Sequence, residues 1–564
     1  MSKADSMKIE VFLLILPAFF FGRAAAAQNA DLILFNGKII TVDAGDRIAQ
    51  AVAVKDGRIL QVGANQKMKA MAGAGCRMID LRGKTVTPGL IDSHYHVLYY
   101  GMQFWPGYFD IRFPKAQSKA DLLSLLAEKG KGLKKGDWIS ANQGFHIRPN
   151  ETLDRRDLDQ VIPDNPAYLR HGSGQYAVVN TAALKIAGID KNTPDPPSSK
   201  ILRDRNGEPT GVLSHYPAEN LVAKFAPGYG DRTEAEMFES IDRGQRLCLQ
   251  AGYTSAQDVI VGNPRDIQAY LKFAETGRLK IKLYLLLYVH TENQARQYIR
   301  MADSFKSDKN VVFSGWKLAL DGGPGAGTML MYDKKMPGAR MSYPYFPQDD
   351  FNRLVKMLHD TGLQVAVHVG GDQGIDMTVT AFEEALKANP RPDSRHRIEH
   401  CLFPSADALA RIKKAGIVVS TSPQWIAWHA DMYAQATSPQ AVARLIPLKS
   451  ILRLGIPLAF GCDVPASIFQ EPKYAFIGAV LRRSKGEAVS PQERITIQEA
   501  LRAHTMGSAY AGFAEKTTGS IEAGKAADFV VWNRDLYTMR GPEAADLKPE
   551  MTIVNGEIVF QTEK

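Results

Sequence analysis

Apolar and polar positions alternate at the two ends of the chain. The alternation runs from Asp31 to Val62, interrupted by Asp56 and Gly57, and it returns in residues 527–532 and 552–559. Alternation is typical of strands with one buried face, and an Asp-Gly pair between two such runs indicates a hairpin. Because the termini of a domain tend to lie close together, we expect both ends to form one small β-sandwich.

The middle of the chain alternates short apolar runs with helical stretches, which favours βα units and a mainly parallel sheet. Eight runs are predicted strands: residues 90–96, 254–258, 282–287, 315–320, 364–369, 397–401, 417–421 and 457–462. Helices are expected at residues 119–129, 233–251, 349–361, 374–388 and 405–415. The predicted fold class is therefore α/β, a (β/α)8 TIM-type barrel. A ninth candidate strand, residues 167–170, belongs to a long insertion at about residues 100–230.

The N-terminus has the features of a secretory signal peptide. Lys3 and Lys8 precede an apolar block from Val11 to Phe21, and small residues follow up to Ala27. The block of 11 residues is shorter than the ~20 residues that span a bilayer. We therefore expect cleavage near Ala27, no stable membrane anchor, and a secreted or periplasmic protein.

These patterns predict the organisation of the whole chain. The signal peptide occupies residues 1–27 and the first part of the sandwich residues 28–86. The barrel with its insertion occupies residues 87–509, and the second part of the sandwich residues 510–564.

Composition and charge exclude two classes of protein. With 45% hydrophobic and 23% charged residues in a length of 564, the chain is not of the disordered type. The formal net charge of +9 is dispersed, and no stretch gathers basic residues with interleaved aromatics. We therefore expect a small-molecule substrate and no nucleic-acid partner, while homo-oligomerisation stays open.

Residues able to bind a metal stand at the ends of the predicted strands. His94 and His96 are two apart at the end of the first strand, so both imidazoles lie on one face. His368, His400 and Asp463 end strands five, six and eight. The C-terminal strand ends of a barrel meet at its mouth, where active sites form. Imidazole and carboxylate ligands suit a divalent cation, so we expect one or two ions per chain, with zinc as the expected metal.

Lys317, on the fourth predicted strand, has two interpretations. Burial lowers the pKa of a lysine, and a neutral amine can take up carbon dioxide to become a carbamate whose two oxygens could bridge two metals. Alternatively, Lys317 forms a buried ion pair with Asp321 or is an ordinary snorkelling lysine. The spacing leaves these alternatives open.

Three segments resemble the metal-dependent amidohydrolase superfamily, most closely its third family, which includes N-substituted formamide deformylases. They are Asn36–Ile39, Val86–His96 and Gly519–Asp528, and the resemblance covers nearly all of the mature chain. It implies a (β/α)8 barrel with a β-sandwich built from both chain ends. By position, it implies that His94, His96 and Asp463 hold one metal. His368 and His400 would hold a second, and a carboxylated Lys317 would bridge the two.

The predicted function is an exported metal-dependent hydrolase that cleaves a non-peptide C–N bond of an amide, formamide or cyclic amide by a metal-activated hydroxide. Asp463 would serve both as ligand and as proton acceptor. Ester or lactone hydrolysis and deamination stay open as competing reactions. A non-catalytic metal-binding or regulatory protein on the same fold is the rival interpretation.

Substrate contacts are expected where the chain departs from that family. His215 stands where the family commonly has glutamate, and Gln175 where it usually has histidine. We expect both to contribute to substrate choice, although no predicted strand ends at either. Trp425 and Trp428, just after the seventh strand, either line an apolar substrate pocket or pack in the core.

Overall fold

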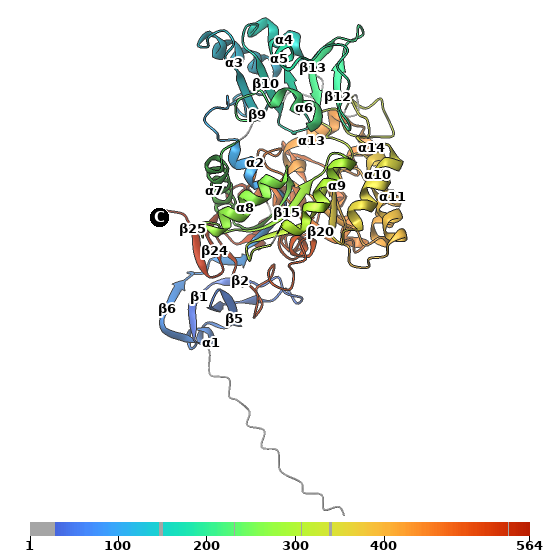
Figure 1. The fold of residues 1–564 in the computed structure, drawn as a ribbon. Coiled ribbons are helices and arrows are strands. Elements are labelled where there is room, and N and C mark those ends of the chain that lie inside the picture. The colour runs from blue at the N-terminus through green and yellow to red at the C-terminus, as the bar shows by residue number, and fades with distance from the viewer. Residues whose placement is uncertain are drawn as a thin grey trace, which may run out of the picture.

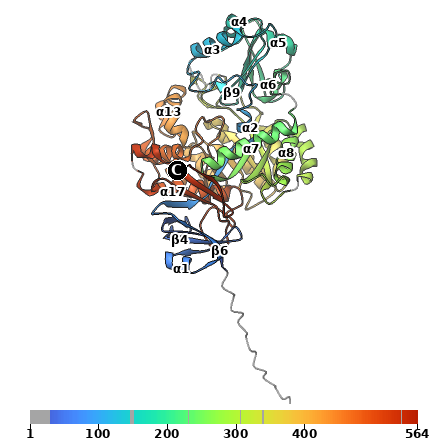
Figure 2. The same cartoon turned by 90° about the vertical axis from the view of Figure 1, so that its left-hand side faces the viewer.

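The structure, a computed structural model, describes residues 29–145, 151–229, 232–305, 307–337, 341–539 and 541–563. The predicted signal peptide, residues 1–27, lies outside the described residues. Figure 1 shows three blocks stacked along the long axis of the molecule: the insertion at the top, the barrel in the middle and the N-terminal strands below. The view in Figure 2, turned by 90°, shows the same order.

The central block is an eight-stranded parallel sheet in the order β20-β19-β18-β17-β16-β15-β14-β8. The backbone N–H of Asp463 donates to the carbonyl of His94 at 2.8 Å, which places the chain after β20 beside β8 and leaves the barrel nearly closed. All eight predicted strands are confirmed, seven of them with shifted ends: β8 (Leu90–Tyr95), β14 (Tyr253–Val261), β15 (Lys282–Tyr288), β16 (Val311–Ala319), β17 (Gln364–Val369), β18 (Arg397–His400), β19 (Val418–Thr421) and β20 (Leu458–Phe460).

Helices cover the outer face of this sheet, and this explains why strands such as β8 and β18 are buried on both faces. Each of the predicted barrel helices is confirmed to within two residues at either end. The side chain of Thr233 caps α7 and that of Ser405 caps α12, because both hydroxyls accept a backbone N–H of the first turn. The outer helices include α2 (Val97–Met102), α7 (Glu234–Gln250), α8 (Pro264–Glu275), α9 (Glu292–Met301), α10 (Gln348–His359), α11 (Asp372–Ala388), α12 (Ala406–Lys414), α13 (Gln424–Ala436), α15 (Leu448–Arg453) and α17 (Ile497–Arg502).

The predicted insertion leaves the barrel after α2 and builds a five-stranded sheet in the order β12-β13-β11-β10-β9. The ninth candidate strand is β10 of this sheet, so its assignment to the insertion is confirmed. The strands are β9 (Ile139–Phe145), β10 (Ala167–His171), β11 (Tyr176–Val179), β12 (Lys200–Arg203) and β13 (Pro209–Ser214), with helices α3 (Lys119–Lys131), α4 (Arg155–Val161), α5 (Thr181–Ala187) and α6 (Tyr216–Ala223) around them.

Strands from both chain ends share one sheet, in the order β25-β24-β23-β7-β2-β3, and a second sheet has the order β5-β4-β1-β6. The predicted Asp56-Gly57 hairpin joins β4 to β5. Leu34 of the second sheet and Phe529 of the first belong to one buried hydrophobic cluster, so the sheets pack on each other. The strands are β1 (Ala30–Phe35), β2 (Lys38–Ile40), β3 (Ile48–Ala49), β4 (Ala51–Lys55), β5 (Arg58–Gly63), β6 (Ala72–Asp80), β7 (Thr85–Pro88), β23 (Phe529–Trp532), β24 (Pro549–Val554) and β25 (Glu557–Gln561).

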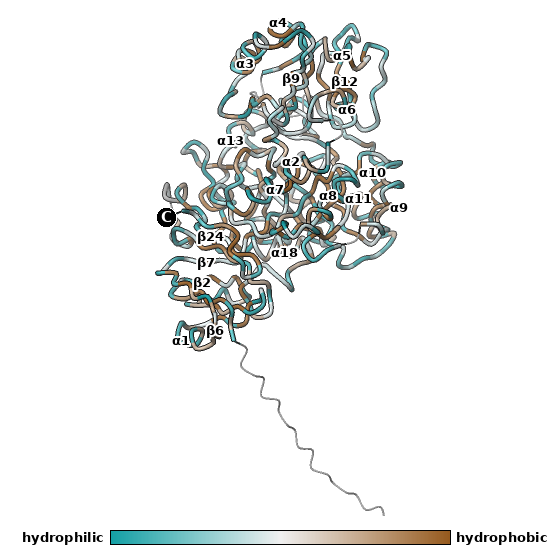
Figure 3. The backbone as a smooth tube through the Cα atoms, turned by 60° about the vertical axis from the view of Figure 1, so that its left-hand side comes forward, coloured by the Kyte–Doolittle hydropathy of each residue, from teal (hydrophilic) through white to brown (hydrophobic). Residues whose placement is uncertain are grey.

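The distribution of apolar residues follows this architecture. In Figure 3 the apolar segments gather inside each block, while hydrophilic segments follow the periphery. Among the described residues, no helix has both the length and the apolar character that crossing a membrane requires.

Candidate metal centre

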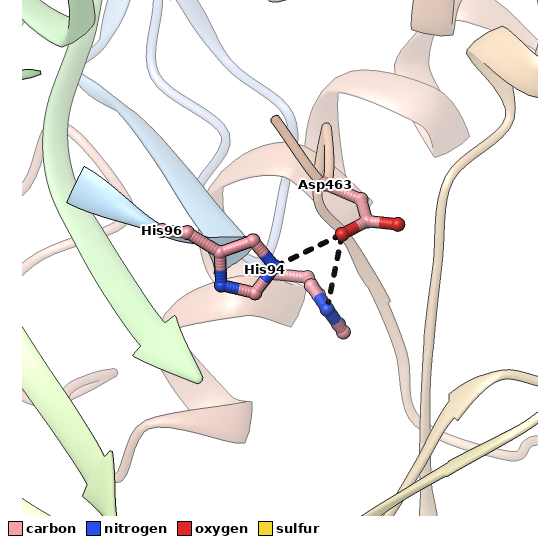
Figure 4. A group of neighbouring side chains, drawn as sticks. All are labelled: His94, His96 and Asp463. Carbon is pink, nitrogen blue, oxygen red and sulfur yellow. Dashed lines mark hydrogen bonds and ion pairs between the residues drawn. The ribbon is translucent and has the colours of Figure 1, made fainter. Parts of the chain in front are cut away.

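The predicted metal-binding side chains meet at one mouth of the barrel. His94 lies on β8, His96 follows it at the start of α2, and Asp463 follows β20. Nε2 of His96 lies 3.1 Å and Nε2 of His94 lies 3.4 Å from the same carboxylate oxygen, Oδ1 of Asp463. Figure 4 shows the two rings converging on this oxygen. All three side chains are buried, and the potential ligand atoms lie within 4.8 Å of one another.

A second pair of imidazoles lies beside this group. Nε2 of His400, at the end of β18, is 2.8 Å from Nδ1 of His368 on β17. The ring centroid of His400 is 4.7 Å from that of His94, so the two groups form one continuous site. Burial lowers the pKa of His368 to about 3, with a further contribution from Lys317, and lowers the pKa of His400 well below its ordinary value. The imidazoles are therefore neutral at pH 7, the state in which they bind metals.

Lys317 is 1% exposed, and its Nζ has no hydrogen-bond partner among the described residues. Asp321 does not pair with it, because the Asp321 carboxylate accepts the backbone N–H groups of Leu330, Gly370 and Gly371 at 2.9 Å each. Burial lowers the pKa of Lys317 to about 8. Of the alternatives left open by the sequence, the structural ion pair with Asp321 is wrong, and complete burial also excludes a snorkelling lysine.

The donor set fits a divalent cation. His96 Nδ1, His400 Nδ1 and Lys317 Nζ are buried polar atoms without a described partner, and the imidazoles of His94 and His96 face a carboxylate across a short gap. Buried polar atoms are normally paired, so unpartnered ones at a cluster of this composition point to a missing ligand. Nitrogen and oxygen donors of this kind suit zinc and its neighbours in the first transition series.

Two residues that support the site were missed by sequence reasoning. Glu399 Oε2 lies 2.6 Å from Nδ1 of His94, and its other oxygen lies 2.7 Å from Nη2 of Arg397. Both Glu399 and Arg397 are 0% exposed. A carboxylate that accepts the N–H of Nδ1 fixes the tautomer that leaves Nε2 free to bind a metal. Alternation places Arg397 and Glu399 on one face of β18, which is the only signal in the sequence.

Two adjoining cavities, each of about 70 Å³, open beside the cluster. Both are bordered by Ser173, Gln175, His368, Asp463 and Ala466. The first, which we call the apolar lobe, has walls that include Pro324, Leu402, Trp425, Met432 and Tyr433. The second, the polar lobe, is lined by residues that include Tyr99, Arg170, His215, Tyr216, Tyr288 and His290. The metal-binding side chains thus lie where an apolar and a polar lobe meet.

The residues predicted to choose the substrate are mostly at this cavity. Gln175 borders both lobes and His215 borders the polar lobe. His215 directly follows β13, so the expectation that no strand ends there is wrong; that strand belongs to the insertion and is only six residues long. Trp425 lines the apolar lobe and stacks on His400 with 5.1 Å between ring centroids. Trp428 is not among the described residues that line the cavity. Its ring packs against the rings of Phe113 and Phe469, with 5.4 and 4.5 Å between ring centroids.

Comparison with known proteins agrees with this geometry. The model of the amidohydrolase family matches residues 77–560. The chain belongs to the amidohydrolase family. It is a metal-dependent amidohydrolase, and the cluster of His94, His96 and Asp463 supports a divalent metal.

Individual amidohydrolase relatives match over most of their length. The chain is 26% identical to an N-substituted formamide deformylase of Arthrobacter pascens, over 95% of this chain and 99% of the relative. It is 30% identical to the protein LONG AFTER FAR-RED 3 of Arabidopsis thaliana, over 89% and 87%. Among solved structures, an uncharacterized metal-dependent hydrolase from Pyrococcus furiosus is 25% identical with a TM-score of 0.67, over 90% and 100%.

Proposed function

We propose that this amidohydrolase hydrolyses a non-peptide C–N bond in an amide, formamide or cyclic amide of small size. The observation that carries the proposal is the convergence of His94, His96 and Asp463 beside a buried, unpartnered Lys317 at the mouth of the barrel. The similarity to an N-substituted formamide deformylase supports a C–N bond as the target. Each lobe measures about 70 Å³, which supports a small substrate.

The cluster would hold two divalent ions, with zinc as the expected metal. His94, His96 and Asp463 would bind one, and His368 and His400 the other. When bound, such an ion polarises a carbonyl oxygen and lowers the pKa of a water molecule to ~7. The role of the protein is to supply neutral imidazoles and a buried carboxylate in fixed positions.

Lys317 would bridge the two groups as a carbamate. Its pKa is lowered to about 8 by burial, so a substantial fraction of the amine is neutral near pH 8 and able to add carbon dioxide. A carbamate would also give this buried side chain the partners that the free amine lacks.

Asp463 is the residue that would move the proton. Burial raises the pKa of its carboxyl group, which makes the carboxylate a better proton acceptor than an exposed one. It would accept a proton from the attacking water and deliver it to the leaving nitrogen. The C–N bond then breaks, and an amine and a carboxylic acid are released.

Metal depletion combined with a substrate screen tests the proposal. We expect protein treated with a chelator to lose turnover of N-formyl, N-acyl and cyclic amide compounds, and added Zn²⁺ to restore it in proportion to the metal bound, measured by elemental analysis. Hydrolysis that persists in metal-free protein would overturn the proposed chemistry. Stoichiometric metal without turnover of any amide, lactone or ester would favour the regulatory interpretation.

Two further features are part of the proposal. The two packed sheets form a β-sandwich domain from residues 28–86 and 510–564, which the hydrophobic cluster shared by both sheets supports. The protein is exported after cleavage near Ala27, which the apolar block and the small residues before Gln28 support.

A further inference from the structure

Gln175 and His215, two of the positions predicted to depart from the family pattern, are joined in the structure by one tyrosine. The ring of Tyr345 stacks on His215 with 3.9 Å between centroids and 17° between planes. The hydroxyl of Tyr345 donates to Oε1 of Gln175 at 2.9 Å. The backbone N–H of His215 also donates to the backbone carbonyl of Gln175 at 2.9 Å. The two departures therefore form a single unit rather than independent changes in loops.

Both ring nitrogens of His215 are already in use. Nδ1 lies 2.8 Å from the carbonyl oxygen of Ser198, which can only accept, so Nδ1 carries the proton. Nε2 is then an acceptor, and the hydroxyl of Tyr288 donates to it at 3.0 Å. His215 is 3% exposed and held from both sides, so it supports the ring of Tyr345 rather than binding a ligand itself.

One end of the Gln175 side-chain amide has no hydrogen-bond partner among the described residues. Its Oε1 is occupied by Tyr345, and Gln175 borders both lobes together with His368 and Asp463. In the opposite orientation, the amide Nε2 would face Tyr345. The hydroxyl of Tyr345 would then have no acceptor for its proton among the described residues. The free end is therefore the NH₂ group, which can only donate hydrogen bonds.

We propose that Gln175 determines specificity by donating from Nε2 to an oxygen of the substrate, and that Tyr345 and His215 hold the amide in this orientation. The oxygen belongs either to the scissile carbonyl or to a carboxylate on the neighbouring substituent. The inference rests on the proposed function, because it places the substrate at the cavity beside Asp463. Gln175 and His215 would thus serve one role, the recognition of a substrate oxygen.

The test uses two probes that differ in one group: N-formylphenylalanine and N-formylphenethylamine, which lacks the carboxylate. The variant Gln175→Glu keeps an acceptor for Tyr345 but replaces the donor that faces the cavity by an acceptor.

Since removing one donor to a developing oxyanion typically reduces kcat 10²–10³-fold, we expect kcat/KM of Gln175→Glu to fall at least about a hundredfold with metal content unchanged. Tyr345→Phe should lower it about tenfold, because the amide loses the bond that orients it.

The control is Tyr343→Phe, which removes a hydroxyl bonded to Ser214 at the end of β13 and should change kcat/KM less than threefold. A fall in kcat with both probes identifies the scissile carbonyl as the acceptor. A rise in KM confined to N-formylphenylalanine identifies the carboxylate.

Binding measured by calorimetry separates failure of the inference from failure of the proposed function. If the wild type binds a probe without hydrolysing it, the proposed function fails. The Kd values of wild type and Gln175→Glu then still test whether Nε2 of Gln175 donates to the bound probe. If Gln175→Glu, with full metal, stays within threefold of wild type in both Kd and kcat/KM, the inference is overturned. Absence of binding and of turnover for both probes in metal-loaded wild type overturns it as well.

Discussion

Glu399 shows how one buried side chain prepares the candidate metal centre. It accepts from Nδ1 of His94 and pairs with Arg397, all without exposure to solvent. Replacing it by glutamine keeps the shape but removes the charge that pairs with Arg397. We expect Glu399→Gln to weaken zinc affinity about 10–100-fold, the range for residues that orient a metal ligand. Competition with a chromophoric chelator measures this.

The matched control is Glu383→Gln on α11, which removes a carboxylate paired with Arg411 on the surface. Its zinc affinity should equal that of the wild type. Equal affinities for Glu399→Gln and Glu383→Gln would show that His94 needs no such partner.

The sequence predicts the positions of His94, His368 and His400 well, because alternation and the convergence of strand ends are general properties of a barrel. The sequence does not predict that Glu399 faces the same site as His400, the next residue. Strict alternation places Glu399 and His400 on opposite faces of β18, but the φ of 73° at His400 breaks the extended backbone, so both reach His94. Backbone conformation of this kind depends on tertiary contacts and leaves no mark in a single sequence.

At the scale of elements, Asp321 fixes the loop after β16 against the start of α11. Its carboxylate accepts backbone N–H groups from Leu330, Gly370 and Gly371. Because Asp321→Ala leaves three buried N–H groups without this acceptor, we expect the free energy of unfolding to fall by at least about 3 kcal/mol in urea titrations. Asp349→Asn, an exposed change on α10, should alter it by less than about 0.5 kcal/mol.

A small effect of Asp321→Ala would mean that the loop is held by other contacts. Metal content measured on the same samples separates a loss of stability from a loss of metal binding. A variant that stays fully stable but loses metal would assign Asp321 to the site instead.

The elements of the barrel are predictable, while those of the insertion are largely not. Three barrel strands span only three or four residues, but they recur between amphipathic helices, so the βα pattern is clear. In the insertion only α3 and β10 were expected; β11 and β12 are four residues each and pair in antiparallel fashion with β13. Without a repeated pattern around them, runs this short resemble loops until their partners are known.

At the scale of the whole molecule, two of the three blocks, the barrel and the insertion, contribute different parts of one site. The barrel supplies the metal-binding side chains from five of its strand ends, α13 supplies the aromatic wall of the apolar lobe, and the insertion supplies Gln175 and His215. No described residue of the sheet shared by the chain ends lines either lobe, and Figure 1 shows β24 and β25 of this sheet at the lower edge of the barrel. The proposed chemistry therefore belongs to the barrel, and the proposed substrate contacts of Gln175 and His215 to the insertion.

In the proposed mechanism, Asp463 must both hold a metal and move a proton. Asp463→Asn keeps the size and one oxygen but removes the charge and the proton acceptor. Measured together on one preparation, metal content should be largely retained while kcat for a hydrolysed amide falls at least about a hundredfold, since general-base assistance is typically worth 10²–10⁴-fold. A variant that folds, retains its metal and turns over near the wild-type rate would contradict the proposed mechanism.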